Sequence, residues 1–341
     1  MKKLKGAHKI VFFFNSLIAA MLLLSYFLPF VAPKTFAFLS VLSLAVPLLI
    51  ILNILFVIYW LLKAKRQLLL SAFVLLLGYN HVSSLYKFTS SKNIENENNL
   101  SIMNYNVRLF NLYNWIPEEQ VEERIVNLIK EAQPDIVSFQ EYHPHDNVDL
   151  SFYKYKYEEL SGTRVKYGQA IFSQFPIISS GSIEFPNTAN NAIYADVVKD
   201  KDTIRIYNVH LQSLHIDSNV EDLKTEDSEM LIKKAIETFK MQQEQTELFV
   251  EHKNLSPYKM IVSGDFNNTA YSYIYKEIKG DLNDSFEEAG NGFGRTFDFR
   301  YFPVRIDFIL VDKSFEVNSF KVFEEKLSDH YPVIAKISLH K

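Results

Sequence analysis

Apolar residues are concentrated in the first quarter of the chain, in long runs that polar residues rarely interrupt. Residues 10–31 read IVFFFNSLIAAMLLLSYFLPFV and residues 36–62 read FAFLSVLSLAVPLLIILNILFVIYWLL, and neither run contains Asp, Glu, Lys or Arg. Each run is at least as long as the ~20 apolar residues that cross a bilayer as a helix. The two runs therefore predict transmembrane helices rather than buried core helices. A cleavable signal peptide fits poorly, because the first run is long and a second follows at once.

A third apolar run is shorter. Residues 67–80 read QLLLSAFVLLLGYN, and their strongly apolar part ends at Gly78. Continuation of the helix through Val82 and Leu85 would make it long enough to span, whereas without this continuation the segment would be a buried core helix. We predict a membrane region over residues 1–89 with three transmembrane helices at about 10–31, 36–62 and 67–85.

Basic residues predict how these helices are oriented. Four lysines precede the first helix and a basic cluster at residues 63–66 follows the second, whereas the link between the two carries only Lys34. The positive-inside rule therefore places the N-terminus and the 63–66 cluster in the cytoplasm. Three spans would make this a multi-pass protein of the cell inner (cytoplasmic) membrane, with everything after residue 86 extracytoplasmic. If residues 67–85 do not span, the side of the remaining chain is reversed.

The hydrophobic pattern changes after residues 90–100, whose polar sequence SSKNIENENNL predicts a linker. Beyond it, short apolar segments predict strands, and two segments with helical spacing predict helices. One helical segment opens at Pro117, and a long helix is predicted over most of residues 228–251. The alternation predicts a layered α/β or α+β domain with strands packed face to face. The predicted strands are 101–107, 135–141, 169–173, 192–198, 203–211, 258–266, 305–312 and 332–339.

The charge of this second domain limits its partners. Residues 98–341 contain 26 Lys plus Arg and 38 Asp plus Glu, which gives a net charge of about −12. Tight, non-specific binding of nucleic acid normally needs a basic surface, so a protein that binds nucleic acid in this way is disfavoured. A hydrolase that contacts a phosphate only transiently is not disfavoured. The chain has no cysteine, which excludes disulfides and thiolate metal sites.

Polar residues that could carry chemistry stand at the ends of several predicted strands. Such positions tend to converge on one rim of a sheet, although each residue taken alone is more often a turn, a cap or a satisfied core residue. Asp265 and Asn267 are two positions apart, so their side chains would point the same way if the backbone there stays extended. The residues concerned are Asn106, Glu141, His210, Asp265, Asn267, Asp307, Asp329 and His330.

These residues lie in seven motifs, which read MNYNVR, DIVSFQE, YGQAIFSQFPI, YNVHLQS, VSGDFNN, RIDFILVD and SDHYPV along the chain. In this order they resemble the motifs of the endonuclease/exonuclease/phosphatase superfamily, which includes pancreatic-type deoxyribonucleases, abasic-site endonucleases, inositol polyphosphate 5-phosphatases and bacterial sphingomyelinases. The resemblance covers roughly residues 100–340. It implies an α+β catalytic domain, here residues 98–341, with a deoxyribonuclease-I-like fold: a four-layer α/β/β/α sandwich of two packed mixed β-sheets flanked by helices.

The resemblance also implies a role for each of these residues in phosphoester hydrolysis, which needs charge neutralisation, a positioned water and help for the leaving group. Asn106, Glu141 and Asp329 would bind Mg²⁺, or Mn²⁺ in its place, with Glu141 as the principal ligand. Asp265 would orient and deprotonate the attacking water, and Asn267 would hold that water or a phosphate oxygen.

Two histidines would act on the phosphoryl group. His330 would face it as an imidazolium, with Asp307 fixing the tautomer and raising the pKa of the ring. His210 would also contact it. Histidine at this position, in the context VHLQS, is typical of the deoxyribonuclease-like, phosphatase and sphingomyelinase branches, whereas abasic-site endonucleases typically carry Tyr. DNA repair is therefore the less favoured branch.

Taken together, these observations predict a membrane-anchored, Mg²⁺-dependent phosphoesterase that hydrolyses a phosphodiester or a phosphomonoester. A lipid or small molecule is favoured over nucleic acid as substrate, and no protein partner is predicted. Two alternatives stay open: a nuclease acting on extracellular DNA or RNA, and a non-catalytic, membrane-tethered binding module. Two loops carry weaker predictions, residues 215–229 as a mobile loop or a solvated connection, and residues 289–297 as a turn in which Arg295 could contact phosphate.

Overall fold

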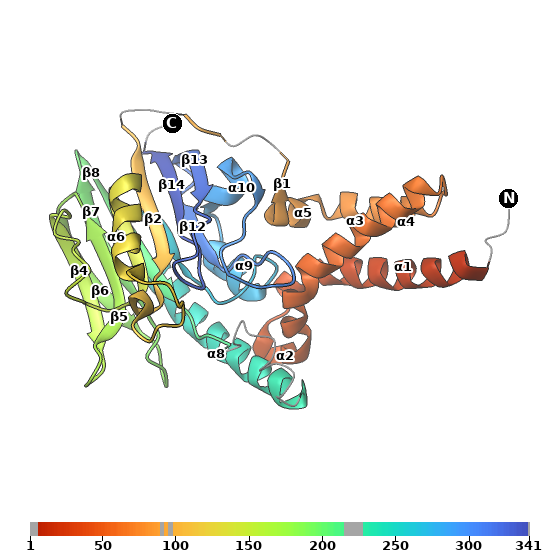
Figure 1. Ribbon diagram of the computed structural model, residues 1–341, viewed down its shortest axis with the longest axis horizontal. Coiled ribbons are helices and arrows are strands. Elements are labelled where there is room, and N and C mark those ends of the chain that lie inside the picture. Colours follow the sequence, from red (N-terminus) through yellow and green to blue (C-terminus); the bar gives the residue numbers. More distant parts are fainter. Residues whose placement is uncertain (1–5, 89–91, 95–97, 215–227, 340–341) are drawn as a thin grey trace.

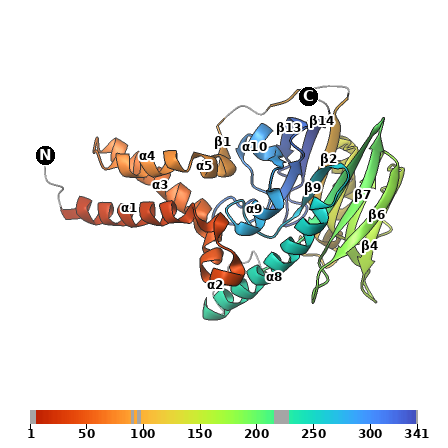
Figure 2. The same cartoon turned by 180° about the vertical axis from the view of Figure 1, so that it is seen from behind.

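The computed structural model describes residues 6–88, 92–94, 98–214 and 228–339. A helical N-terminal part projects from one side of a β-sandwich that contains the rest of the chain (Figure 1). Viewed from behind, the same helices leave the sandwich next to α8 and α9, whose bounds are given below (Figure 2).

The sandwich consists of two six-stranded mixed sheets packed face to face. Apolar residues from both inner faces, including Ile102, Ile206 and Ile261, form one buried core between the sheets. The first sheet has the order β10 (Asn283–Asp284), β12 (Asp307–Val311), β9 (Lys259–Asp265), β8 (Asp202–His210), β7 (Asn191–Lys199) and β6 (Ile177–Glu184). The second has the order β13 (Glu316–Val322), β14 (Val333–Ser338), β2 (Leu100–Asn106), β3 (Ile136–Tyr142), β5 (Tyr167–Ser173) and β4 (Tyr155–Ser161).

Helices cover the outer face of each sheet. α6 (Val121–Ala132) connects the parallel strands β2 and β3 and packs on the second sheet through its apolar stripe. α8 (Ser228–Asn254) connects the parallel strands β8 and β9, and with α9 (Tyr273–Lys279) it packs on the first sheet. The short α10 (Ser285–Ala289) closes one end of the core. The predicted four-layer α/β/β/α sandwich is confirmed, as is the long helix over residues 228–251.

Three long strands, β4, β6 and β13, are missing from the sequence prediction, whereas all eight predicted strands are present. Each of the three forms an edge of its sheet, so it has one neighbour and carries exposed or half-buried side chains along much of its length. β6 reads IISSGSIE, which lacks the alternation of apolar and polar residues that marks a half-buried strand.

Two N-terminal helical runs are long and apolar enough to cross a membrane. The first is α1 (Gly6–Ser25), extended by a 3₁₀ turn to Phe30, and the second runs from α2 (Pro33–Val41) through a 3₁₀ turn to α3 (Val46–Leu62). The third apolar segment is divided into α4 (Leu68–Leu77) and α5 (Tyr79–Leu85), which meet at an angle of 83°. The single helix predicted over residues 67–85 is thus two helices, and a third span stays a prediction.

The bend between α4 and α5 falls at Gly78 because Tyr26 of the first run occupies the space next to it. A Cβ atom at Gly78 would lie 2.1 Å from the Tyr26 ring, so any other residue would displace this ring. The Tyr26 hydroxyl donates a hydrogen bond to the carbonyl of Val74 at 2.8 Å. Farther along the bundle, Asn15 links α1 to two other helices, accepting from Trp60 Nε1 at 2.8 Å and donating to Ser71 Oγ at 2.5 Å.

The helical part is fixed to the sandwich through α2 and α8, which lie side by side (Figures 1 and 2). The backbone N–H of Lys34 donates to Gln243 Oε1 at 2.7 Å, and Lys34 Nζ forms an ion pair with Glu247 at 2.6 Å.

A second set of contacts joins the sandwich to the 3₁₀ turn before α3 and to α5. The Thr269 hydroxyl donates to the carbonyl of Ser43 at 3.3 Å, and the Tyr271 hydroxyl donates to the carbonyl of His81 at 3.2 Å. Directly after α5, the short strand β1 (Tyr86–Lys87) pairs with β11 (Gly292–Phe293). The helical part therefore packs on the sandwich directly as well as through the linker.

A buried ion pair lies next to this contact and supports a prediction about stability. Arg305 Nη1 donates to Asp284 Oδ2 at 2.6 Å, and the Tyr275 hydroxyl donates to the same oxygen at 2.6 Å. We expect Asp284→Asn to lower the free energy of unfolding by about 3 kcal/mol, because it leaves the buried Arg305 charge with only the more distant Glu287 carboxylate, at 4.0 Å. Asp281→Asn, which removes an exposed ion pair with Lys313, is the matched control and should cost less than about 1 kcal/mol.

The measurement is the midpoint of thermal unfolding of the purified protein in detergent. Burial raises the pKa of Asp284, but Arg305 and Tyr275 outweigh this effect, so its pKa lies below the ordinary value. The contribution of the pair is therefore present above the unfolded-state pKa of about 3.9 and is lost as the pH falls through the lower, folded value. Equal midpoints for the two variants at neutral pH would contradict the prediction.

Candidate active site

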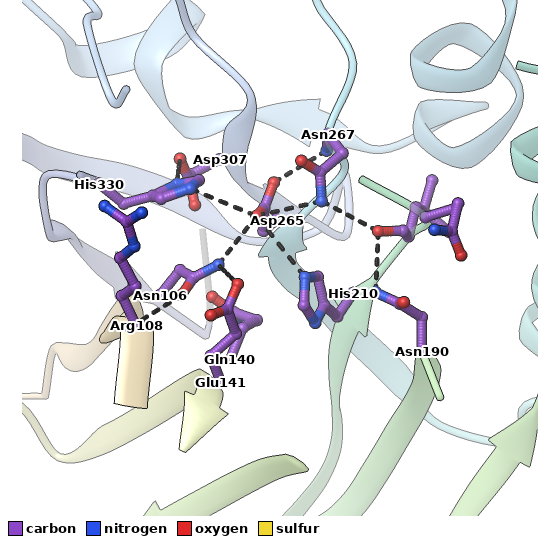
Figure 3. A network of polar contacts seen from close by, with 12 residues as sticks. Asn106, Arg108, Gln140, Glu141, Asn190, His210, Asp265, Asn267, Asp307 and His330 are labelled. Atoms are coloured by element: carbon purple, nitrogen blue, oxygen red, sulfur yellow. Dashed lines mark hydrogen bonds and ion pairs between the residues drawn. The ribbon is translucent and has the colours of Figure 1, made fainter. Parts of the chain in front are cut away.

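The predicted site residues lie together at one rim of the sandwich, where strand ends from both sheets meet (Figure 3). β2 and β3 run parallel, so their C-terminal ends share an edge, and the same holds for β8 and β9. In the first sheet Asp265 on β9 lies opposite His210 on β8 and opposite Asp307 on β12. The second sheet supplies Asn106 and Glu141.

The Asp265 carboxylate occupies the centre of this group and is buried. Its Oδ2 accepts a hydrogen bond from Asn106 Nδ2 at 3.0 Å, and lies 3.6 Å from His330 Nε2 and 3.8 Å from His210 Nε2. Its Oδ1 accepts from the backbone N–H of Asn267 at 2.8 Å. Burial raises the pKa of Asp265 to about 7, because it outweighs the lowering effect of the nearby His330.

The backbone around Asp265 explains the motif SGDFN. Gly264 has φ 153°, and a Cβ atom there would lie 2.0 Å from the carbonyl oxygen of Val209, so only glycine fits beside β8. Asn267 has φ 49°, which is left-handed rather than extended. The expectation of an extended backbone, drawn from the two-residue spacing, is therefore wrong. The turn directs Asn267 back to Asp265, and Asn267 Nδ2 donates a separate hydrogen bond to the carbonyl of Leu211 at 2.9 Å.

His330 lies between two carboxylates. Its Nδ1 is 2.9 Å from Asp307 Oδ2, and its Nε2 faces Asp265. Burial alone would lower the pKa of His330, but Asp307 and Asp265 raise it well above the ordinary value. The Phe297 ring packs edge-on against the imidazole, with 5.0 Å between ring centroids. These contacts hold His330 as an imidazolium whose Nε2–H points into the site.

The residues expected to bind a metal form a second group beside Asp265. Asn106 Nδ2 is 3.2 Å from Glu141 Oε1, and Asp329 forms an ion pair with Arg108 at 3.2 Å. Burial, and then the nearby Asp329 charge, raise the pKa of Glu141. Two half-buried carboxylates that repel each other, beside an asparagine whose Oδ1 accepts from the backbone N–H of Arg108, fit a divalent cation that prefers oxygen ligands.

Another metal-like cluster consists of Asp265, Asp307 and His330, whose ligand atoms all lie within 4.8 Å of one another. Both ring nitrogens of His330 already face carboxylates, and the raised pKa keeps both protonated. An imidazolium has no lone pair for a metal, so the contacts of His330 favour an acid–base group here.

Glutamine side chains of α8 hold the catalytic loops from behind. Gln242 Nε2 donates to the carbonyls of Gln212 at 2.7 Å and Asn267 at 3.2 Å, while its Oε1 accepts from Asn268 Nδ2 at 2.7 Å. Gln245 Oε1 accepts from the backbone N–H of Gln212 at 2.9 Å. These glutamines were outside the sequence prediction because a polar residue on a helix ordinarily faces solvent.

Other residues at the site also escape the sequence analysis. Arg108 lies in the motif MNYNVR, and its guanidinium stacks on the half-exposed ring of Trp115 at 4.5 Å. Asn190 Nδ2 donates to the carbonyl of Leu211 at 3.1 Å and so shares this acceptor with Asn267. The position of Arg108, two residues after a predicted ligand, was a usable signal, whereas nothing local marks Asn190.

The two loops with weaker predictions have different outcomes. Residues 215–227 lie outside the described part of the chain. Within residues 289–297, Arg295 pairs with Asp298, donates to the Tyr331 hydroxyl at 2.9 Å and stacks on the Tyr331 ring. A phosphate contact of Arg295 stays a prediction.

Comparison with known proteins agrees with this geometry. The sequence model of the Endonuclease/Exonuclease/phosphatase family matches residues 103–330, and that of a domain of unknown function (DUF8431) matches residues 8–85. No curated protein matches the chain.

Several solved structures share the fold at low sequence identity. An endonuclease/exonuclease/phosphatase from Beutenbergia cavernae is 18% identical with a TM-score of 0.54, and covers 72% of each chain. Humanized Danio rerio TDP2 is 18% identical with a TM-score of 0.55, over 71% of this chain and 99% of its own. The mannosyl-6-phosphatase Bt3783 of Bacteroides thetaiotaomicron is 21% identical with a TM-score of 0.52, over 70% and 99%. The match over residues 103–330, together with the fold, shows that the chain belongs to the endonuclease/exonuclease/phosphatase family and is a hydrolase acting on phosphoester bonds.

Proposed function

We propose that this protein is a membrane-anchored, Mg²⁺-dependent phosphoesterase that hydrolyses a phosphodiester or phosphomonoester by attack of water. The observation that carries the proposal is the buried Asp265 carboxylate, which faces two histidines and two asparagines at the rim of the sandwich. A binding module would have no chemical need for this arrangement, so the non-catalytic alternative is disfavoured.

Asp265 is proposed to accept a proton from the attacking water. A general base with a pKa near neutrality is largely ionised at neutral pH and still accepts a proton readily. The raised pKa of Asp265, about 7, meets this condition. Asn267 is held by the carbonyl of Leu211 and can orient the water or a phosphoryl oxygen.

His330 and His210 are proposed to donate hydrogen bonds to the phosphoryl oxygens. Both present Nε2 to the same carboxylate oxygen of Asp265, so a phosphoryl group bound there would meet both rings. Asp307 keeps His330 protonated and fixes its orientation.

Asn106, Glu141 and Asp329 are proposed to hold the metal ion, Mg²⁺ or Mn²⁺. When bound, the ion would supply positive charge that neutralises the phosphate and the leaving group. Arg108, which pairs with Asp329, adds a positive charge at the same edge.

We further propose three spans in the cell inner membrane, with the catalytic domain extracytoplasmic. The arrangement of contacts supports an odd number of spans. Trp60, next to the basic cluster 63–66, contacts His8 and Asn15 near the N-terminus, whereas Ser43 and His81 contact the catalytic domain. The basic cluster and the catalytic domain therefore lie at opposite ends of the helical bundle.

The test of the proposed function is hydrolysis of chromogenic phosphodiesters and phosphomonoesters by the full-length protein in detergent. Turnover should require Mg²⁺ or Mn²⁺ and cease with excess chelator. A nuclease acting on extracellular DNA or RNA remains the second candidate, supported by the shared fold with TDP2, and single-stranded DNA in the same assay separates the two. Absence of metal-dependent turnover of every phosphoester would refute the proposed function.

The metal ligands have a test that does not depend on turnover. We expect Glu141→Gln to weaken Mn²⁺ binding, measured by calorimetry, at least about tenfold, because it removes a carboxylate from a site of few ligands. Glu131→Gln, which changes an exposed carboxylate at the end of α6, is the control and should bind Mn²⁺ as the native protein does. Unchanged affinity in Glu141→Gln would place the metal elsewhere.

A further inference from the structure

In the arrangement of three spans proposed above, the end of the first apolar run lies at the boundary of the hydrocarbon core. The helical run Gly6–Phe30 has 25 residues. At 1.5 Å per residue it is about 37 Å long, which exceeds the ~30 Å thickness of the core. Lys34 follows Phe30 by four residues and is bound to α8 of the catalytic domain. This end of the run therefore reaches the lipid headgroup layer, on the side where the catalytic domain lies.

The catalytic domain meets the bundle at this same level. Lys276 of α9 lies over the Phe30 ring, with Nζ 5.2 Å from its centroid. Thr269 donates to Ser43, and Tyr271 donates to His81. The domain is thus held against the membrane surface by contacts on three of its elements, and it cannot swing away without breaking them.

Two of these contacts, those of Thr269 and Tyr271, belong to the loop that follows Asp265. Thr269 follows Asp265 by four residues, which at ~3.5 Å per residue places the carboxylate's backbone within about 14 Å of the membrane part. On the other side of the site, Arg305 precedes Asp307 by two residues and lines the same cavity as Pro47, Ser84 and Leu85 of the membrane part. The active site is therefore fixed next to the headgroup layer.

A loop rich in aromatic residues joins the site to this layer. Residues 297–303 read FDFRYFP. The loop begins at Phe297, which packs on His330, and its base is closed by the Thr296 N–H, which donates to the carbonyl of Val304 at 2.9 Å. Both sides of this base, Gly294 with Arg295 and Pro303 with Val304, line the cavity shared with Pro47 and Leu85.

The tip of this aromatic loop has the composition of a membrane-interface segment. Phe299 packs against Tyr301 and Phe302, while the Tyr301 side chain is 60% exposed and Arg300 is exposed. Tyrosine and arginine are favoured at the level of the headgroups, where the ring contacts acyl chains and the guanidinium contacts phosphate. Phe27 and Phe30 of the bundle are exposed as well, and the Phe30 ring lies beside Lys276 of α9.

We infer that the substrate is the phosphoester of a lipid headgroup in the membrane that holds the protein, in the leaflet facing the catalytic domain. The inference rests on the proposed function, and names the substrate class of the same site. The aromatic loop contacts the leaflet beside His330, and the headgroup phosphate enters the site from the bilayer surface. The acidic domain, with its net charge of about −12, repels a polyanion such as DNA from solution but not a phosphate presented by the membrane.

The test uses full-length protein reconstituted in phosphatidylcholine vesicles with Mg²⁺. These vesicles carry phosphatidylethanolamine, phosphatidylglycerol, phosphatidylinositol phosphate, sphingomyelin or phosphatidic acid, and release of headgroup or phosphate is measured. A soluble chromogenic diester and single-stranded DNA are assayed with the same preparation. Sharing one membrane raises the effective concentration of substrate, so we expect at least one lipid to be hydrolysed about 100-fold faster per mole than the soluble diester. Lipid in separate, enzyme-free vesicles should be spared.

Variants of the aromatic loop give a second readout. Arg300→Gln combined with Tyr301→Ser should lower the rate on vesicle lipid about tenfold relative to the rate on the soluble diester. Tyr155→Ser is the matched control, since Tyr155 is an exposed tyrosine on β4, which lies on the side of the sandwich away from the bundle (Figure 1). It should leave both rates as in the native protein.

Each outcome decides between the two proposals. Metal-dependent hydrolysis of the soluble diester without hydrolysis of any lipid, or preferential hydrolysis of DNA, overturns the lipid inference and leaves a phosphoesterase. Hydrolysis of enzyme-free vesicles at the same rate as the enzyme's own membrane also overturns it. Silence on every substrate overturns the proposed function and the inference together.

Discussion

Replacing Asp265 with asparagine is expected to lower kcat by about 10³-fold or more while leaving the fold intact. The amide is nearly the same size as the carboxylate, and its single oxygen can keep one of the two contacts, with Asn106 Nδ2 or with the backbone N–H of Asn267, but it cannot accept a proton from water. Because the buried carboxylate carries a desolvation penalty in the native protein, the asparagine variant should be at least as resistant to thermal unfolding.

The combination of lost turnover and retained stability separates a catalytic role from a structural one. The measurement is the steady-state rate on a chromogenic phosphoester beside the midpoint of thermal unfolding. Asp202→Asn, at the opposite end of the strand that carries His210, serves as the control and should keep native turnover. A variant at Asp265 with more than about a tenth of native kcat would exclude its role as the base.

Replacing Asp307 with asparagine is expected to lower kcat/KM by about 10²- to 10⁴-fold and to change its pH dependence. Asp307 is the carboxylate that faces Nδ1 of His330, and with Asp265 it raises the pKa of the ring above the ordinary value. In the native protein the imidazolium is lost only as the pH rises through this raised pKa. Without the Asp307 charge the pKa falls, so the alkaline limb of the kcat/KM profile should move to lower pH.

This shift identifies Asp307 as a positioning residue, since a purely structural defect would lower the rate at every pH alike. The control is Asp196→Asn, which removes an equally buried carboxylate from its ion pair with Arg205 far from the rim. It should destabilise the protein and leave the pH profile unchanged. A profile for Asp307→Asn that has the native shape would contradict the assigned role.

Sequence patterns predict the strands of this fold that are buried on both faces. Such a strand, for example β9, is apolar whatever its neighbours are, and the motif VSGDF marks both the strand and its end. Sequence patterns do not predict edge strands such as β4, because solvent covers one side of the strand and its residues follow no fixed pattern. The bend at Gly78 depends on Tyr26, which lies about fifty residues earlier, and local sequence does not contain this contact.

The same distinction applies to the site. His330 and Asp307 stand at strand ends in motifs, so their meeting at one rim follows from the topology of parallel and antiparallel neighbours. The left-handed turn at Asn267 and the support from Gln242 are properties of packing, because they arise from loops and a helix brought together only in the folded chain. Residue types therefore predicted which groups meet at the rim, and the structure was needed to show what holds them.

The contacts of Thr269 and Tyr271 with Ser43 and His81 have a consequence for how the enzyme can be studied. A soluble fragment that begins at the linker would lose both acceptors and uncover Tyr271, which is buried against Leu22 and Val46 of the helical bundle. The segment following Asn267 would then be free to rearrange, and the fragment would expose an apolar patch that invites aggregation. Removal of the helical part would therefore take away part of the scaffold of the active site.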